Sequence, residues 1–109
     1  MHERTKALGI TIAVKEAVAD RDSFDGWPCC LMCGTPAPFY NRLAYSNAHY
    51  ISRAQGGLGH REDNILTLCP GCHLRYDQGE GRETLKRFFK RYLMEHYPNW
   101  NEENLYYKK

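Results

Sequence analysis

The chain has no long hydrophobic run, which excludes the classes of protein that span or cross a membrane. No stretch approaches the roughly 18 consecutive apolar residues of a transmembrane helix. The N-terminal residues do not combine a basic start, an apolar run of signal-peptide length and a small-residue cleavage site. We therefore expect a cytoplasmic protein with no membrane partner.

A strong excess of charge of one sign is also missing. The 15 lysines and arginines face 13 aspartates and glutamates, which leaves a net charge of +2. Net charge alone therefore does not predict a nucleic-acid partner, and the distribution of the basic residues has to be considered. With 109 residues, 42% of them hydrophobic, the chain predicts one small domain over residues 1–109 whose core would gain from a bound metal ion.

Cysteines are too few, and odd in number, for a disulfide framework. Of the 5 cysteines, four form two pairs with the spacing Cys-x-x-Cys, and Cys29 is left over. This usage favours a reducing compartment. Thiolates three residues apart can occupy two corners of a tetrahedron, so two such pairs complete a zinc site. We predict one structural zinc bound by Cys30, Cys33, Cys69 and Cys72.

His73 follows the second cysteine pair directly, and two interpretations of it remain open. In the first, the four cysteines fill the tetrahedral zinc site and His73 is free for another role. In the second, His73 replaces Cys72 as the fourth zinc ligand, or only orders the turn.

Hydrophobic periodicity places helices at both ends of the chain. It predicts an N-terminal helix over about residues 3–21 and an amphipathic C-terminal helix over about residues 82–97. Between them, residues 43–50 have the aromatic, partly alternating character of a strand, and residues 65–68 form a second short strand. The glycine-rich segment 52–63 is expected to be an irregular loop. Pro70 suits the first turn of a short helix that Gly79 and Gly81 would end.

Two segments, NAHYISRAQGG and DNILTLCPGCHLRYD, closely resemble the motif of the HNH endonuclease family. The resemblance extends over about residues 18–77 and includes the run VADRD before the first cysteine pair. It implies a small α+β fold of the ββα-metal type, with four-cysteine zinc knuckles and a core over about residues 18–79. It also implies an endonuclease of phage or bacterial type that hydrolyses DNA phosphodiester bonds.

The resemblance carries roles to three residues of this chain. His49 matches the histidine that acts as the general base and activates a water molecule. Asn64 matches a residue that braces a loop in some members and binds metal in others, and both roles remain open. His73 matches a ligand of the catalytic cation, which explains a histidine beside a complete zinc site.

The chain departs from the family pattern at Ala48, where the residue before the first histidine is very often a metal ligand. Asp77 lies one helical turn after His73, so we predict that it replaces this ligand, the alternative being a solvated helix residue. One imidazole with a hard oxygen ligand suits Mg²⁺ or Mn²⁺. The departure also supports an alternative function, a non-catalytic module on an HNH scaffold that binds DNA or a protein.

Basic residues next to the motif predict how DNA would be bound. Arg53 follows the first strand closely and could hold a phosphate oxygen, the alternative being a solvated surface residue. The C-terminal helix carries a basic flank that could follow a duplex backbone, although amphipathic helices often have a solvated face of this kind. The flank comprises Lys86, Arg87, Lys90 and Arg91.

A compact chain with this motif resembles the small HNH proteins of phages and mobile elements. We therefore also expect a larger complex of that origin as a partner.

Overall fold

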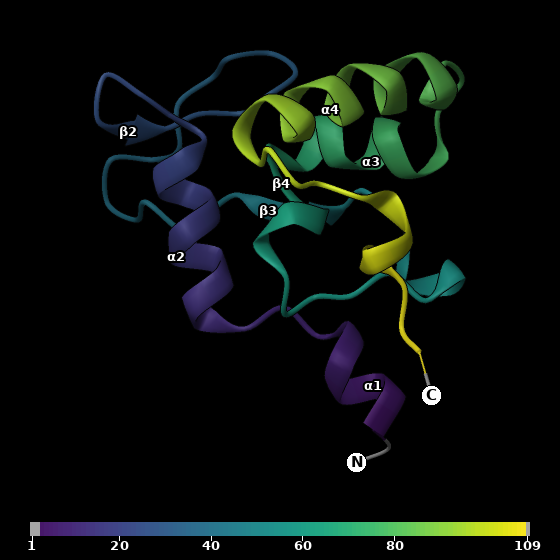
Figure 1. Cartoon of the computed structure of the whole chain (residues 1–109). Coiled ribbons are helices and arrows are strands. Elements are labelled where there is room, and N and C mark those ends of the chain that lie inside the picture. The colour runs from purple at the N-terminus through teal and green to yellow at the C-terminus, as the bar shows by residue number, and fades with distance from the viewer. Residues whose placement is uncertain (1–2, 109) are drawn as a thin grey trace.

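Figure 1 shows a computed structural model of the chain, which describes residues 3–108. It is a small α+β structure, as the sequence predicts, and it contains two antiparallel strand pairs. Short 3-10 turns occupy Arg53–Gln55, Glu62–Asn64 and Glu102–Leu105. Within residues 3–108, no helix has the length and apolar character needed to cross a membrane. The elements are α1 (Glu3–Leu8), α2 (Ile12–Arg21), β1 (Ser23–Phe24), β2 (Trp27–Pro28), β3 (Ser46–His49), β4 (Ile65–Leu68), α3 (Pro70–Gln78) and α4 (Arg82–His96).

The prediction of a single N-terminal helix over residues 3–21 is wrong at its middle, because the helix is interrupted between Leu8 and Ile12. Glycine is a poor helix former, and Gly9 lies in the break. Thr11 starts the second helix, since its hydroxyl oxygen accepts the backbone N–H of Val14 at 3.2 Å. The interruption matters because it turns the end of α1 towards the centre of the molecule.

The hairpin of β1 and β2 was not predicted, because strands of two residues are too short to show an alternating pattern. Its turn residues Asp25 and Gly26 both have positive φ, 57° and 83°. Two central residues of this kind produce the turn whose twist matches a tight hairpin, and an Asp-Gly pair favours it. The other predicted elements are confirmed. β4 occupies the predicted residues, β3 ends as expected but begins three residues later than the predicted segment, and α3 and α4 lie within a residue or two of the predicted helices.

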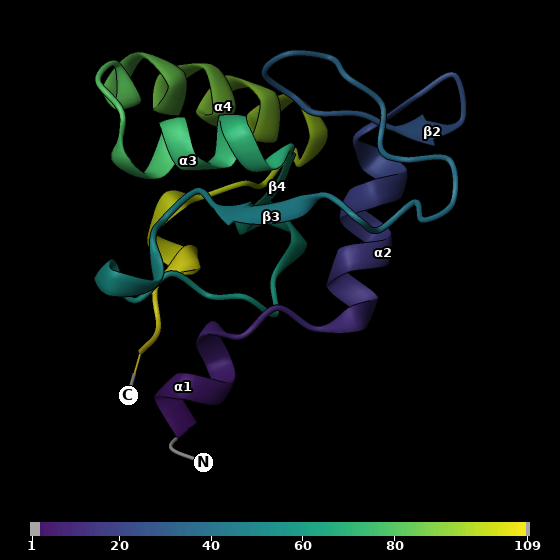
Figure 2. The ribbon, with the colours of Figure 1, turned by 180° about the vertical axis from the view of Figure 1, so that it is seen from behind.

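The central hairpin of β3 and β4 is covered by helices. Its register pairs His49 with Ile65 and Ser46 with Leu68. All four residues of β4 are buried, so this strand lies inside the molecule. Figure 1 shows α3 and α4 stacked above the hairpin and α2 at its side. From behind, β3 runs between α3 above and the N-terminal segment below (Figure 2). The strand that ends at His49 therefore lies between parts of the chain that are distant in sequence.

A buried ion pair joins three of these elements. Arg21 at the end of α2 binds the carboxylate of Asp22 through two hydrogen bonds of 2.7 and 2.9 Å. The same carboxylate accepts the hydroxyl of Tyr92 in α4 and the backbone N–H of Thr67 in β4. Burial alone would lower the pKa of Arg21, but its bonds to Asp22 outweigh this and raise the pKa. The network fixes α2 and α4 on the central hairpin.

Candidate active site and metal centre

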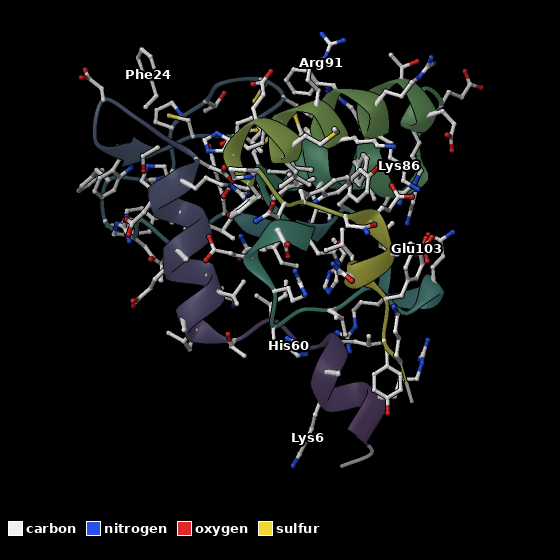
Figure 3. The ribbon with its side chains drawn as sticks, in the orientation of Figure 1. Lys6, Phe24, His60, Lys86, Arg91 and Glu103 are labelled. Carbon is white, nitrogen blue, oxygen red and sulfur yellow. The ribbon has the colours of Figure 1, made fainter. Side chains whose placement is uncertain are left out.

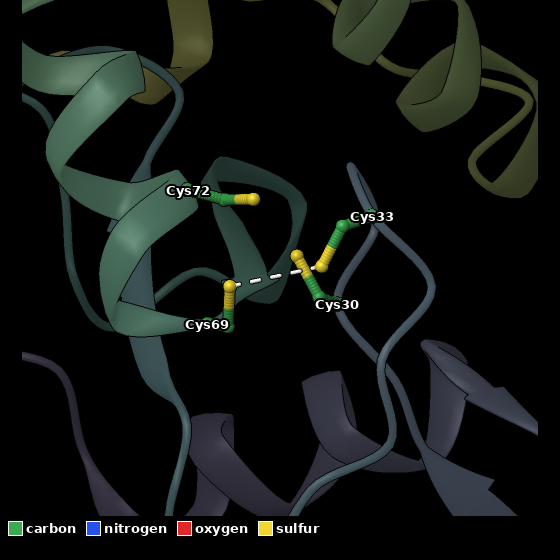
Figure 4. Close-up of side chains that lie close together, drawn as sticks. All are labelled: Cys30, Cys33, Cys69 and Cys72. Carbon is green, nitrogen blue, oxygen red and sulfur yellow. Dashed lines mark hydrogen bonds between the residues drawn. The ribbon is translucent and has the colours of Figure 1, made fainter.

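The four paired cysteines meet at one point, as predicted. Their sulfur atoms all lie within 4.8 Å of one another, and Cys33 Sγ is 3.7 Å from Cys69 Sγ (Figure 4). A tetrahedral zinc with metal–sulfur bonds of about 2.3 Å has sulfur–sulfur edges of about 3.8 Å, so the cluster has the size of a zinc site. His73 is not part of this cluster. The interpretation in which His73 replaces Cys72 as a zinc ligand is therefore wrong.

Local backbone bonds hold the two knuckles in register. In the first, Gly34 takes a positive φ of 77° and its N–H binds Cys30 O at 2.9 Å, which closes the tight turn. In the second, Cys69 precedes α3 and its carbonyl accepts the N–H of His73 at 2.8 Å. Hydrogen bonding between Cys33 and Thr35 lowers the pKa of Cys33 to about 6. Each pair of ligands is thus preset by its own short turn.

Next to the zinc cluster lies a cavity of about 980 Å³ that brings together the predicted base, the predicted cation ligands and one predicted phosphate-binding residue. His49, Arg53, His73 and Asp77 all line it. They come from the end of β3, the loop after it and one face of α3. The sequence motif predicted that these residues would meet, and the structure brings them together.

The imidazole of His49 is held by an unexpected partner. Its Nε2 lies 2.9 Å from the carbonyl oxygen of Leu8, at the end of α1. Because a carbonyl can only accept, this bond keeps the proton on Nε2 and leaves the lone pair of Nδ1 available. Burial lowers the pKa of His49 below its usual 6.5, and the charge of Arg53 adds to this effect. His49 is therefore a neutral, oriented imidazole near neutral pH.

The packing of Leu8 against the long loop fixes this arrangement. A Cβ atom at Gly59 would lie 2.4 Å from Leu8 O and 2.5 Å from the carbonyl carbon of Gly9. The N–H of Gly59 also binds Ala7 O at 2.9 Å. Only glycine allows the loop to come so close, so Gly59 helps to place the carbonyl that orients His49.

His73 and Asp77 converge on one another, as their spacing on α3 predicted. His73 Nε2 is 3.1 Å from Asp77 Oδ2, and the two side chains are 26% and 48% exposed. Neighbouring ligands of an octahedral ion with bonds of about 2.1 Å are about 3 Å apart, so this pair of donor atoms has the spacing of two ligands of one cation. Arg82 Nη1 lies 3.8 Å from Asp77 Oδ1 and balances part of its charge. The pair can hold a divalent cation at the wall of the cavity.

Asn64 is buried and braces the loop. Its side-chain oxygen accepts the N–H of Ile51 at 2.8 Å, and its amide nitrogen donates to the carbonyls of Ile51 and Leu58 at 3.3 and 2.9 Å. It has no exposed surface and does not line the cavity. Of the two roles left open, the contacts of Asn64 favour loop bracing.

The face of β3 that points to the cavity differs from the one the family pattern suggested. Ala48 is completely buried in the core and does not line the cavity, whereas Asn47 does. Side chains alternate along a strand, so Asn47 and His49 share one face. This alternation is the signal that could have identified Asn47, and the sequence analysis missed it.

The basic residues at the cavity are partly different from those predicted. Arg53 lines it, and so do Lys15 of α2 and Arg82 of α4. Arg82 is held by a 2.7 Å bond to Tyr76 O and by its position over the Tyr76 ring. Lys15 was not expected, because it precedes residues 18–77, over which the sequence resembles the motif.

The predicted basic flank of α4 lies away from this cavity. None of Lys86, Arg87, Lys90 and Arg91 lines it. Lys86 packs over the ring of Tyr50 at 5.3 Å, and Arg91 projects outwards from α4 (Figure 3). Their role in binding DNA stays a prediction.

Comparison with known proteins identifies the central segment. The family model described as HNH endonuclease matches residues 30–79. This range includes both cysteine pairs and every predicted residue of the cavity, but leaves out α1, α2 and α4. The comparison with curated proteins gave no match, and neither did the comparison with solved structures.

Proposed function

We propose that this chain, whose residues 30–79 carry the HNH motif, is a metal-dependent endonuclease that hydrolyses phosphodiester bonds in DNA. The observation that carries the proposal is the meeting of His49, His73 and Asp77 in one cavity. The matched family makes DNA the expected partner. We assign the activity to a single domain over residues 1–109.

His49 acts as the general base in this proposal. Its Nδ1 takes a proton from a water molecule as the water oxygen attacks the phosphorus atom. The bond to the 3′-oxygen breaks, that oxygen takes up a proton from solvent, and the products carry 5′-phosphate and 3′-hydroxyl ends. The bond from Nε2 to Leu8 O supports this role, because it keeps the ring oriented and stabilises the imidazolium after proton transfer.

His73 and Asp77 would hold the catalytic cation, Mg²⁺ or Mn²⁺ by the chemistry of the donor atoms. When bound, such a cation supplies stabilisation of the negative charge on the phosphoryl oxygens and the leaving oxygen. Arg53, Arg82 and Lys15 give the cavity positive charge that can bind and orient the phosphate. The four cysteines hold a structural zinc, separate from this chemistry.

A second candidate function is a module that binds DNA or a protein without cutting. One observation favours it: residue 48, which is often a metal ligand in family members, is an alanine buried in the core of this chain. The test below separates the two functions, because a binding module would leave DNA intact with every cation.

The test is to incubate purified protein with supercoiled plasmid in the presence and absence of Mg²⁺ or Mn²⁺. We expect cleavage that requires the cation and that falls by about a hundredfold or more in His49→Ala. His60→Ala is the matched control, because His60 is exposed and lies outside the cavity. Cleavage by His49→Ala at the rate of His60→Ala would remove His49 from the mechanism, and no cleavage by the wild type would support the binding module.

A further inference from the structure

Two aromatic side chains near the cavity are exposed and have no part in the catalytic arrangement. Phe39 is 89% exposed and Tyr40 is 77% exposed, and their rings meet edge to face with centroids 5.5 Å apart. Proteins usually bury such rings because each one offers a large apolar surface. This aromatic pair is therefore a candidate contact surface.

The turn that carries the aromatic pair is fixed at both ends. The N–H of Asn41 binds Pro38 O at 3.1 Å, which places both rings at the tip of a tight turn. Before the turn, Ala37 is hydrogen-bonded to the hairpin of β1 and β2. After it, Arg42 pairs with Asp20 of α2 at 2.5 Å. The backbone of the turn is therefore anchored on both sides, which reduces the conformational entropy that the loop would lose when the rings bind.

The same loop leads directly into the cavity. Leu43 and the residues that follow it, up to Asn47, line the cavity wall. Leu43 is three residues after Tyr40, so at most about 11 Å of chain separates the aromatic pair from the cavity rim. Figure 2 shows this loop passing beside α2 into β3. A strand whose phosphate lies in the cavity would therefore have its neighbouring bases within reach of the rings.

We propose that the aromatic pair stacks on unpaired bases of the DNA strand that is cut. The substrate class would then be DNA with single-stranded or unpaired bases beside the cleaved bond. This inference rests on the proposed nuclease function. A cavity with Lys15, Arg53 and Arg82 takes the phosphate, while exposed rings take the bases. Stacking tolerates any sequence because every base has a π face.

Binding is measured separately from cleavage to test this inference. Every protein carries His49→Ala, no divalent cation is added, and the probes are a labelled single-stranded oligonucleotide and the blunt duplex of the same sequence. We expect Phe39→Ala with Tyr40→Ala to weaken single-strand binding by about tenfold or more, and to leave duplex binding nearly unchanged. Tyr40→Phe should retain binding, because it keeps the ring.

Phe24→Ala is the matched control for loss of an exposed ring. Phe24 is 78% exposed in β1, does not line the cavity and points away from the molecule (Figure 3). We expect it to bind both probes like its parent. Equal losses in Phe24→Ala and the double variant, or equal losses on single strand and duplex, would overturn the inference.

The outcomes also separate this inference from the proposed function. Plasmid cleavage that depends on His49, combined with unchanged single-strand binding in the double variant, would overturn the stacking and leave the nuclease function standing. Ring-dependent single-strand binding by a wild type that never cuts would support the stacking and overturn the nuclease function. A change of oligomeric state in the double variant without a change in binding would mean that the rings contact a second copy, which also overturns the inference.

Discussion

The zinc cluster and the cavity beside it are built from the chain in opposite ways. The cluster uses two short turns, each of which supplies two sulfur ligands three residues apart. The cavity combines side chains of α2, β3, α3 and α4 with the carbonyl of Leu8 at the end of α1. The comparison teaches that local spacing can preset the ligands of a chelating site, whereas the lining of a cavity depends on how distant segments pack.

The largest expected effect comes from breaking the zinc cluster. In a chain of this size the free energy of zinc binding, about 10–16 kcal/mol in small zinc domains, is largely free energy of folding. We expect Cys69→Ser, or removal of zinc by a chelator, to abolish the cooperative thermal transition followed by circular dichroism. Cys29→Ser is the control, since Cys29 lies outside the cluster. A zinc-free protein with an unchanged transition would contradict the assignment.

The next effect concerns the framework that holds the walls of the cavity together. Asp22→Asn leaves the buried guanidinium of Arg21 without its carboxylate, in a pair whose side chains are 6% and 0% exposed. We expect the free energy of unfolding, measured by urea titration, to fall by about 3–5 kcal/mol. Asp20→Asn breaks only the exposed pair with Arg42 and should cost about 1 kcal/mol or less. Equal losses of unfolding free energy in both variants would show that the buried ion pair contributes no more to stability than the exposed one.

A smaller effect tests whether the cavity can be changed without touching the zinc cluster. Asp77→Ala removes one proposed cation ligand, so the Mg²⁺ or Mn²⁺ concentration for half-maximal cleavage should rise, by about tenfold or more. Zinc content and thermal stability should stay unchanged, because the thiolate site does not include Asp77. Glu80→Ala is a matched control on an exposed carboxylate just after α3. An unaltered cation dependence in Asp77→Ala would make Asp77 a solvated helix residue.

The smallest expected effect is a shift in pH dependence. His49 works as a base only when neutral, and burial lowers its pKa below 6.5, so the acid limb of kcat/KM should lie below pH 6.5. Arg53→Gln removes a charge that lowers this pKa, so the limb should move to higher pH. The stability of the fold should also fall as the pH falls. Below pH 6.5 the unfolded chain takes up a proton on His49 more readily than the folded chain does, so the free energy of unfolding decreases. A limb that does not move in Arg53→Gln would show that Arg53 does not affect the base.

Sequence patterns predicted the local parts of this structure well. The Cys-x-x-Cys spacing identified the ligands of the zinc cluster, and helical spacing placed His73 and Asp77 on one face of α3. Apolar periodicity placed α4 correctly but joined α1 and α2, because it does not register a cap such as Thr11 inside an otherwise continuous pattern. Each success depends on residues within one or two helical turns of each other.

The sequence by itself determined which residues are the candidates for the chemistry: the four cysteines, His49, His73 and Asp77. Only the tertiary structure decided what surrounds them. The Leu8 carbonyl that orients His49 is 41 residues away in the chain, and Lys15 reaches the cavity from a helix outside the matched segment. The same packing buried Ala48 and placed the basic flank of α4 away from the cavity. The physical reason is that residue spacing fixes geometry only within one element, whereas these contacts depend on how separate elements share a core.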